Sequence, residues 1–280
     1  MNLSDDAQHS VNRQAYKLVN LSTVLTMPKI VFITGATSGF GKACAEKFAA
    51  QGYDLILNGR REERLEQVKQ DLEKRFNTAV LLLPFDVQLQ EKVFNAIETI
   101  PEEWQKIDVL INNAGLALGR DYFADANLDD WNIMIDTNLK GLLYVTKAIL
   151  PFMIKNKSGH IINMGSVAAK EVYEKGNVYC AAKAAVDTLS KAMRVDLLQH
   201  NVKVTAIHAG AAETEFSLVR FKGDEETAKK IYDGLVPLTA EDIADVIYYC
   251  ASLPSHVCIN DMVITCTQQA NAIYFNRQKN

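Results

Sequence analysis

Residues 29–51 read KIVFITGATSGFGKACAEKFAAQ. A short apolar run (29–34) leads into a turn with three glycines, and residues 42–51 then follow a helical pattern. Strand, glycine-rich turn and helix in this order form the phosphate-binding arrangement of dinucleotide-binding folds. Glycines let the backbone approach a pyrophosphate, and the helix amino terminus offers free N–H groups. The spacing Gly-x-x-x-Gly-x-Gly differs from the usual fingerprint, so the strand-to-helix context carries the prediction.

Strands and helices alternate through the rest of the chain. Further strands are expected at 54–58, 79–83, 108–111, 159–166, 202–208 and 262–267, with helices at 61–76, 88–99, 129–150, 177–200 and 242–252. This order predicts an α/β fold: a single doubly wound, Rossmann-like parallel sheet of about seven strands, with helices on both faces. Residues 28–280 are expected to form one catalytic domain in which the polar segment 211–237 is a lid. Residues 1–27 are expected to be a peripheral or weakly ordered extension.

Composition narrows the class of protein. The 280 residues carry a formal net charge of -4 without a long basic run, which argues against a nucleic-acid surface. No apolar stretch approaches the ~18 residues of a membrane span, and the first residues lack a signal-peptide pattern, so a cytoplasmic protein is expected. The five cysteines have no Cys-x-x-Cys spacing. Neither a disulfide framework nor a metal site is predicted.

The residues that follow the second strand bear on the choice of cofactor. Gly59-Arg60-Arg61 stands where an acidic residue would hold the ribose of NAD. Arginines at this point suit the 2′-phosphate of NADP instead. Arg61 fits equally well as the first turn of the following charged helix. Asp86-Val87 and Asn112-Asn113-Ala114-Gly115 follow the third and fourth strands, at the same expected edge of the sheet.

The stretch Asn-Val-Tyr-Cys-Ala-Ala-Lys at 177–183 is the expected centre of the chemistry. On a helix, Tyr179 and Lys183 are four residues apart and share one face. A neighbouring ammonium is expected to lower the pKa of the Tyr179 phenol, making it a proton shuttle. Ser166, at a strand's carboxyl end, can hold the substrate oxygen. Taken alone, the Tyr-x-x-x-Lys spacing fits an ordinary solvated helix pair more often than a catalytic one.

Asn138 is expected inside the helix 129–150, among apolar neighbours. A buried amide must find hydrogen-bond partners, and asparagine weakens a helix interior. The presence of Asn138 at this position is therefore explained either by tertiary hydrogen bonding or by a functional role.

Taken together, these motifs resemble the short-chain dehydrogenase/reductase family over essentially Pro28 to the C-terminus. The resemblance implies hydride transfer between a nicotinamide cofactor and an alcohol or carbonyl. It makes Tyr179 the acid/base and Ser166 the group that orients the substrate oxygen. It also makes Lys183 the group that lowers the tyrosine pKa and binds the ribose, and Asn138 the support of a water-mediated proton relay. The expected cofactor-binding residues are Thr34, Gly35, Thr37, Ser38, Gly39, Phe40, Gly41, Arg60, Arg61, Asp86, Val87, Asn113, Ala114, Gly115, Tyr179, Lys183, Gly210 and Thr214.

More narrowly, residues 112–119 and 214–224 resemble the NADP-dependent 3-hydroxy acid dehydrogenases. That resemblance implies substrates such as L-allo-threonine, serine and 3-hydroxypropionate or malonic semialdehyde, and a homotetramer. Ala209-Gly210 stands where the family has Pro-Gly, which loosens the loop beside the nicotinamide because proline fixes φ.

Alternatives remain open for the substrate. A reductase of another carbonyl compound, such as a 3-oxoacyl thioester, shares the same chemistry. A non-catalytic NADP-binding regulator would not need Ser166, Tyr179, Lys183 and Asn138 together. For an acid substrate, the carboxylate needs a cation, and Arg220 is the first candidate because its guanidinium can bind a carboxylate with two parallel bonds. A surface or subunit-contact role for Arg220 fits the sequence equally well.

Overall fold

The computed structural model describes residues 28–278, in which seven parallel strands form one sheet in the order β3-β2-β1-β4-β5-β6-β7. The extension expected at residues 1–27 lies outside the described residues. The predicted parallel, doubly wound sheet is confirmed. The strands are β1 (Ile30–Ile33), β2 (Asp54–Gly59), β3 (Val80–Pro84), β4 (Ile107–Asn112), β5 (Gly159–Met164), β6 (Val202–Ala209) and β7 (Asp261–Ile264).

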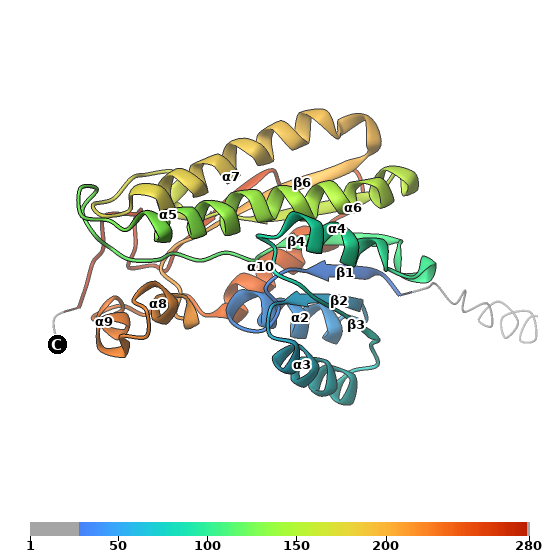
Figure 1. The fold of residues 1–280 in the computed structure, drawn as a ribbon, viewed down its shortest axis with the longest axis horizontal. Coiled ribbons are helices and arrows are strands. Elements are labelled where there is room, and N and C mark those ends of the chain that lie inside the picture. The colour runs from blue at the N-terminus through green and yellow to red at the C-terminus, as the bar shows by residue number, and fades with distance from the viewer. Residues whose placement is uncertain (1–27, 279–280) are drawn as a thin grey trace, which may run out of the picture.

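Helices cover both faces of this sheet (Figure 1). On one side lie α2 (Gly39–Ala50), α3 (Glu62–Arg75) and α10 (Ala240–Ser252); on the other lie α4 (Gln90–Glu98), α5 (Leu128–Ile135), α6 (Leu142–Asn156) and α7 (Asn177–Asp196). Single turns of 3-10 helix occur at Glu102–Trp104, Val167–Ala169 and Leu198–His200. Within residues 28–278, no helix is both long and apolar enough to cross a lipid bilayer.

Each central strand contributes side chains to two hydrophobic cores. In β1, Val31 and Ile33 pack in the core shared with α2, α3 and α10, whereas Ile30 and Phe32 pack in the opposite core with α4 and α6. Successive side chains of a strand point to opposite faces, so a strand buried on both faces must be apolar throughout. Burial on both faces of the sheet therefore explains the continuous apolar runs in the strand segments of the sequence.

The helix expected at 129–150 is interrupted, which corrects the prediction. A π-helical turn, Asp136–Gly141, separates α5 from α6, and α6 continues to Asn156. Asn138 lies in this turn, and its Nδ2 donates to the carbonyl of Met134 at 2.8 Å. In a regular α-helix, that carbonyl would accept the backbone N–H of Asn138. The Asn138 side chain bonds to this carbonyl within the π-helical turn, a local arrangement that a helical pattern in the sequence does not reveal.

Two other element bounds differ where they affect the site. Helix α2 begins at Gly39 rather than at residue 42, so the last two glycines of the turn belong to its first turn. Strand β5 ends at Met164, which leaves Ser166 two residues beyond the strand as the N-cap of the 3-10 turn that follows. Glycine is a poor helix former, and the sequence pattern therefore starts the helix too late.

The segment expected to be a lid contains two short helices, α8 (Glu215–Arg220) and α9 (Glu225–Lys230). Both lie beyond the carboxyl ends of the strands, beside the helical layer of α2 (Figure 1). Ser217 Oγ and the Tyr232 hydroxyl are 2.6 Å apart, and the same hydroxyl donates to the carbonyl of Ala212 at 2.8 Å. The segment is therefore a folded cover joined to the end of β6.

Candidate active site

A cleft of about 420 Å³ opens at the carboxyl ends of β1, β4, β5 and β6. It lies where the strand order reverses between β1 and β4, the usual position of ligand sites in doubly wound sheets. The predicted residues that line it are Gly35, Thr37, Ser38, Gly39, Phe40, Arg60, Arg61, Asp86, Val87, Asn113, Ala114, Gly115, Ser166, Tyr179, Lys183, Gly210 and Thr214. Four predicted residues, Thr34, Gly41, Asn138 and Arg220, lie outside this lining.

Thr34 lies beneath the cleft and holds its floor together. Its Oγ1 accepts hydrogen bonds from the backbone N–H groups of Asn113 and Ala114, both at 3.0 Å. In return, Asn113 Nδ2 donates to the carbonyls of Thr34 and Gly35 at 2.9 and 3.1 Å. The sequence predicted a cofactor contact for Thr34, but its buried side chain is fully used in joining the ends of β1 and β4.

Two glycines are required by contacts inside the turn. Gly35 has a φ of +66°, and a Cβ there would lie 3.0 Å from Ala114 Cα. A Cβ on Gly41 would collide with the Gly35 carbonyl oxygen. Gly41 thus lets α2 pack against the turn rather than touching a ligand itself. The turn therefore stays close to the first N–H groups of α2, which suits a phosphate.

Ser166, Tyr179 and Lys183 converge at one end of the cleft. All three are buried, at 9, 8 and 6% exposure. Ser166 Oγ accepts the N–H of Ala168 at 3.1 Å, so its own hydrogen remains available to a second partner. Lys183 Nζ donates to the carbonyl of Met164 at 2.8 Å and lies 5.9 Å from the centre of the Tyr179 ring.

The expected lowering of the Tyr179 pKa is not seen. Burial raises the pKa of Tyr179, aided by the nearby Tyr173 phenol and opposed by hydrogen bonding to Ser166 and by Arg220. Burial also lowers the pKa of Lys183 to about 8. Desolvation disfavours the charged form of each group, and the Lys183 ammonium is directed at the Met164 carbonyl. At neutral pH, Tyr179 is a proton donor beside an ammonium.

The Asn138 side chain is fully bonded to the protein. Its Oδ1 accepts the N–H of Leu116 at 2.9 Å, and its Nδ2 donates to the carbonyls of Leu116 and Met134 at 2.7 and 2.8 Å. A Cβ on Gly115 would lie 2.7 Å from Asn138 Oδ1 and 3.4 Å from Lys183 Nζ. Asn138 therefore fixes the segment that follows β4 close to Lys183. The sequence left two explanations for Asn138, tertiary hydrogen bonding and function. The tertiary hydrogen bonds are present, and the role of Asn138 in a proton relay stays a prediction.

The two arginines after β2 lie at the other end of the cleft. Arg60 Nη1 is 3.6 Å from Asp86 Oδ2, and the Arg60 side chain is 61% exposed. Arg61 Nη2 donates to Thr37 Oγ1 at 3.4 Å, across from the glycine-rich turn. Both guanidinium groups are therefore near the turn, and Arg61 is more than a helix start. Such exposed contacts contribute little to stability and leave both groups free to re-pair.

Arg220 reaches the Tyr179 end from the lid. Its Nη1 donates to the Tyr173 hydroxyl at 2.9 Å, and its Cζ is 5.6 Å from the centres of both the Tyr173 and the Tyr179 rings. The backbone of Arg220 accepts the N–H of Gly119 at 3.0 Å. The guanidinium is thus fixed beside the phenol. Lys222, the other basic candidate, is paired with Asp130 at 2.8 Å.

Two residues at the Tyr179 end of the cleft were not predicted from the sequence. Phe216 lies on α8 with its ring 5.7 Å from that of Tyr179, and Thr137 lines the cleft from the π-helical turn. Within residues 28–278, the buried Thr137 Oγ1 has no hydrogen-bond partner. Its position next to Asn138 is the one signal that could have found it. Phe216 carries no such signal, since a folded lid brings it to the site.

Residues 29–224 match the family model of the short chain dehydrogenases. Sulfoacetaldehyde reductase 2 of Chromohalobacter salexigens is 46% identical over 247 residues, covering 87% of this chain and 96% of that protein. The NADP-dependent 3-hydroxy acid dehydrogenase of Escherichia coli (strain K12) is 44% identical over 251 residues, covering 89% of this chain and all of that protein.

A solved structure is similar to the same extent. The closed form of serine dehydrogenase complexed with NADP+ superposes with a TM-score of 0.83 at 44% identity. It covers 89% of this chain and all of the serine dehydrogenase chain. The likeness therefore includes the strands, the cleft and the segment over it.

The pKa of Lys183 leads to a stability prediction. A lysine with a pKa of about 8 in the folded state and near 10.5 when unfolded releases its proton from the folded state first. Between these values the unfolded state binds more protons, so the buried lysine becomes less unfavourable as pH rises. Relative to Lys183→Met, the wild-type free energy of unfolding should therefore increase by about 2 kcal/mol from pH 7 to 9.5. Denaturant unfolding of both proteins measures this, and a constant difference would contradict the lowered pKa.

Proposed function

Because this chain belongs to the short-chain dehydrogenase family, we propose that it transfers a hydride between NADP(H) and the reactive carbon of a small 3-hydroxy or 3-oxo acid. One observation carries the proposal: Ser166, Tyr179 and Lys183 converge at the end of a cleft that Arg220 approaches from the lid. Tyr179 is a proton donor, Ser166 adds a second hydroxyl, and Lys183 and Arg220 are cations. Together these groups suit an anionic substrate whose carbonyl is reduced to an alcohol.

The cleft fits a dinucleotide. The glycine-rich turn and the start of α2 offer N–H groups to a pyrophosphate, and the close contacts inside the turn leave no room for a side chain at Gly35 or Gly41. Arg60 and Arg61 lie beyond the turn, where a 2′-phosphate would need cations. When bound, the nicotinamide supplies or accepts the hydride. The chain's own residues bind it, orient the substrate and move a proton.

In reduction, the substrate oxygen lies between the Ser166 and Tyr179 hydroxyls. The Ser166 hydrogen is free to donate, since its oxygen already accepts from Ala168. Burial keeps Tyr179 protonated, so the phenol can give its proton to the oxygen as negative charge develops there. In oxidation, the phenol must take up a proton from the alcohol. The Lys183 ammonium then stabilises the phenolate, because an opposite charge favours the ionised form.

The relatives agree on a small substrate with an anionic group. A 3-oxo acid carries a carboxylate, and sulfoacetaldehyde carries a sulfonate, close to the carbonyl that reacts. We assign the anion to Arg220, whose guanidinium lies beside the Tyr179 ring. The substrates we propose are therefore of the L-allo-threonine, serine and 3-hydroxypropionate or malonic semialdehyde type. The alternative, a 3-oxoacyl thioester, has no free anion at this place, and assays of free acids against thioesters separate the two.

A cytoplasmic homotetramer belongs to the same proposal. Both features rest on the resemblance to the 3-hydroxy acid dehydrogenases. Light scattering coupled to size-exclusion chromatography measures the subunit number.

Tyr179→Phe tests the proposal directly. The variant keeps the ring against Phe216 and removes only the hydroxyl, with the proton that we assign to catalysis. We expect kcat to fall about 10²- to 10⁴-fold, with little change in NADPH affinity. Steady-state kinetics measures kcat, and NADPH fluorescence titration measures the affinity for NADPH. Near-normal kcat in Tyr179→Phe would refute the assigned acid/base.

The cofactor preference should depend on Arg60. We expect NADP(H) to be favoured over NAD(H) about ten- to a hundredfold, because one charge-assisted contact contributes roughly 1.5–3 kcal/mol. Arg60→Ala should reduce this preference more than Arg61→Ala, the matched control from the neighbouring position. The ratio of kcat/KM for the two cofactors measures it in each variant. Equal efficiency with both cofactors in the wild type would be incompatible with the assignment.

Arg220→Ala should separate charged from neutral substrates. We expect KM for an acid substrate to rise while reduction of a neutral aldehyde of similar size stays close to the wild-type rate. Lys222→Ala is the control, since its ammonium pairs with Asp130 instead. If Arg220→Ala slowed both substrates equally, the arginine would be holding the lid to Tyr173 and not binding the anion.

A further inference from the structure

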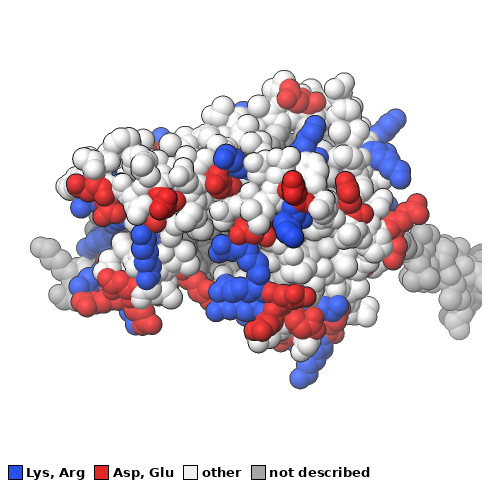
Figure 2. Space-filling model, in the orientation of Figure 1, with Lys and Arg blue, Asp and Glu red and all other residues white. Residues whose placement is uncertain are grey.

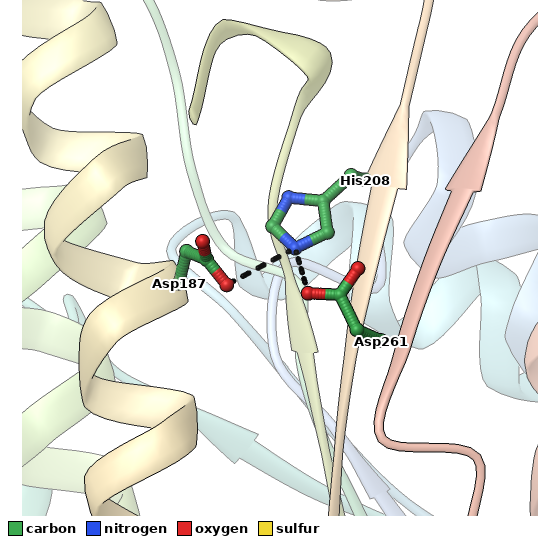
Figure 3. A group of neighbouring side chains, drawn as sticks. All are labelled: Asp187, His208 and Asp261. Carbon is green, nitrogen blue, oxygen red and sulfur yellow. Dashed lines mark ion pairs between the residues drawn. The ribbon is translucent and has the colours of Figure 1, made fainter. Parts of the chain in front are cut away.

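A group of ligand-type side chains, two of them buried, lies directly behind Ser166 and outside the cleft lining. It consists of Asp187 on α7, His208 on β6 and Asp261 at the start of β7 (Figure 3). His208 Nε2 is 3.6 Å from Asp187 Oδ1 and 3.4 Å from Asp261 Oδ2. The three ligand atoms all lie within 4.8 Å of one another. Three elements that are remote in sequence therefore direct one donor atom each at a common point.

The hydrogen bonding of His208 fixes which ring nitrogen faces this point. Its Nδ1 is 3.1 Å from the carbonyl oxygen of Ser166, and a carbonyl can only accept. Nδ1 must therefore carry the hydrogen, and a neutral ring turns the lone pair of Nε2 toward the two carboxylates. A histidine binds a metal ion in this neutral form, through the lone pair of the nitrogen that carries no hydrogen.

Two of the three converging atoms lack a hydrogen-bond donor in the described part of the chain, whereas Asp261 Oδ2 accepts from Lys170 Nζ at 2.7 Å. Within residues 28–278, His208 Nε2 and Asp187 Oδ1 are buried and make no hydrogen bond. His208 is fully buried, and the Asp187 side chain is 9% exposed. Buried acceptors that face one another are unfavourable unless a proton or a cation lies between them.

The two separations from His208 Nε2 match those between ligand atoms around a metal ion. A Zn²⁺ ion bound at about 2.0–2.2 Å to nitrogen and oxygen donors would see atoms 3.4–3.6 Å apart at angles of roughly 110–120°. A metal-bound histidine commonly donates its second ring N–H to a backbone carbonyl, which fixes the ring orientation. The bond from His208 to Ser166 is of that kind.

We propose that Asp187, His208 and Asp261 bind one divalent transition-metal ion, with Zn²⁺ as the probe. The ion links α7, β6 and β7 behind the active site and lies outside the cleft. Through His208 it supports the Ser166 backbone and the start of the Ala209–Gly210 loop. The site goes beyond the proposed oxidoreductase activity and does not depend on it. The sequence predicted no metal site, because the three ligands are spread over 75 residues of chain.

Lys170 is the competing cation. Its Nζ donates to Asp187 Oδ2 at 3.1 Å and to Asp261 Oδ2 at 2.7 Å, and Lys191 Nζ donates to Asp187 Oδ2 at 3.0 Å. Both lysines thus leave Asp187 Oδ1 free for a metal, whereas Lys170 occupies Asp261 Oδ2, the oxygen that faces His208 Nε2, and must move before a metal can bind there. The Lys170 side chain is 30% exposed and can move outward, and its ammonium should weaken metal binding by repulsion.

Isothermal titration of the metal-stripped full chain with Zn²⁺ tests the site. We expect one ion per chain in the wild type, with an affinity about tenfold or more weaker in Asp261→Asn and in His208→Gln. Lys170→Met should bind about tenfold more tightly, because it removes the competing charge and keeps the side-chain length. Asp245→Asn is the matched control, since it removes a surface carboxylate that pairs with Lys47 elsewhere. It should bind as the wild type does.

Thermal unfolding gives a second readout independent of catalysis. Saturating Zn²⁺ should raise Tm by several degrees in the wild type and in Asp245→Asn, because an ion bound only to the folded state stabilises it. Asp261→Asn should show no such rise. Asp261 is the most exposed of the three ligands, so this variant remains informative if His208→Gln fails to fold. Unchanged Zn²⁺ affinity in Asp261→Asn, or no Zn²⁺ bound by wild type and Lys170→Met, would overturn the proposal and leave Lys170 and Lys191 as the counter-charges of the two carboxylates.

Discussion

The hydrogen bonds exchanged between Thr34 and Asn113 are the interaction on which the rest of the site depends. They join the ends of β1 and β4, where the strand order reverses and the cleft opens. Thr34 accepts two backbone N–H groups of the turn after β4, and Asn113 satisfies two carbonyls of the glycine-rich turn after β1. Each buried group left unpaired would cost about 1–3 kcal/mol. This exchange therefore fixes the phosphate end of the cleft relative to the segment that approaches Lys183.

Burial controls the electrostatics at the reacting end. The same removal of water raises the pKa of Tyr179 and lowers that of Lys183, because each group is disfavoured in its charged form. The result is a protonated phenol beside an ammonium of reduced basicity. That combination suits proton donation to a carbonyl oxygen. The Met164 carbonyl directs the ammonium and Asn138 brings Gly115 close to it, so the proton chemistry rests on backbone positions as much as on the tyrosine and lysine themselves.

Charged groups from distant segments meet on two sides of Ser166 and Tyr179. On the lid side, Arg220 bonds to the Tyr173 hydroxyl and faces the Tyr179 ring. Behind the serine, His208 is held between the Ser166 carbonyl and two carboxylates that Lys170 also pairs (Figure 3). Elsewhere the visible surface carries interspersed acidic and basic side chains (Figure 2). Charge is organised around the active site by tertiary contacts, and each cation there has a defined carboxylate or aromatic partner.

The sequence by itself determined that the sheet is parallel, the order in which strands and helices follow one another along the chain, and the motif residues at the strands' carboxyl ends. Strand and helix periods, glycine spacing and the Tyr-x-x-x-Lys pair are local, so a single chain segment contains the whole signal. Only the tertiary structure decided the π-helical turn at Asn138, the supporting role of Thr34, the raised pKa of Tyr179 and the meeting of Asp187, His208 and Asp261. Each depends on what surrounds a side chain after folding: a carbonyl captured by an amide, loss of water around a phenol, or donor atoms brought together from separate strands and helices. Spacing along the chain contains none of these distances.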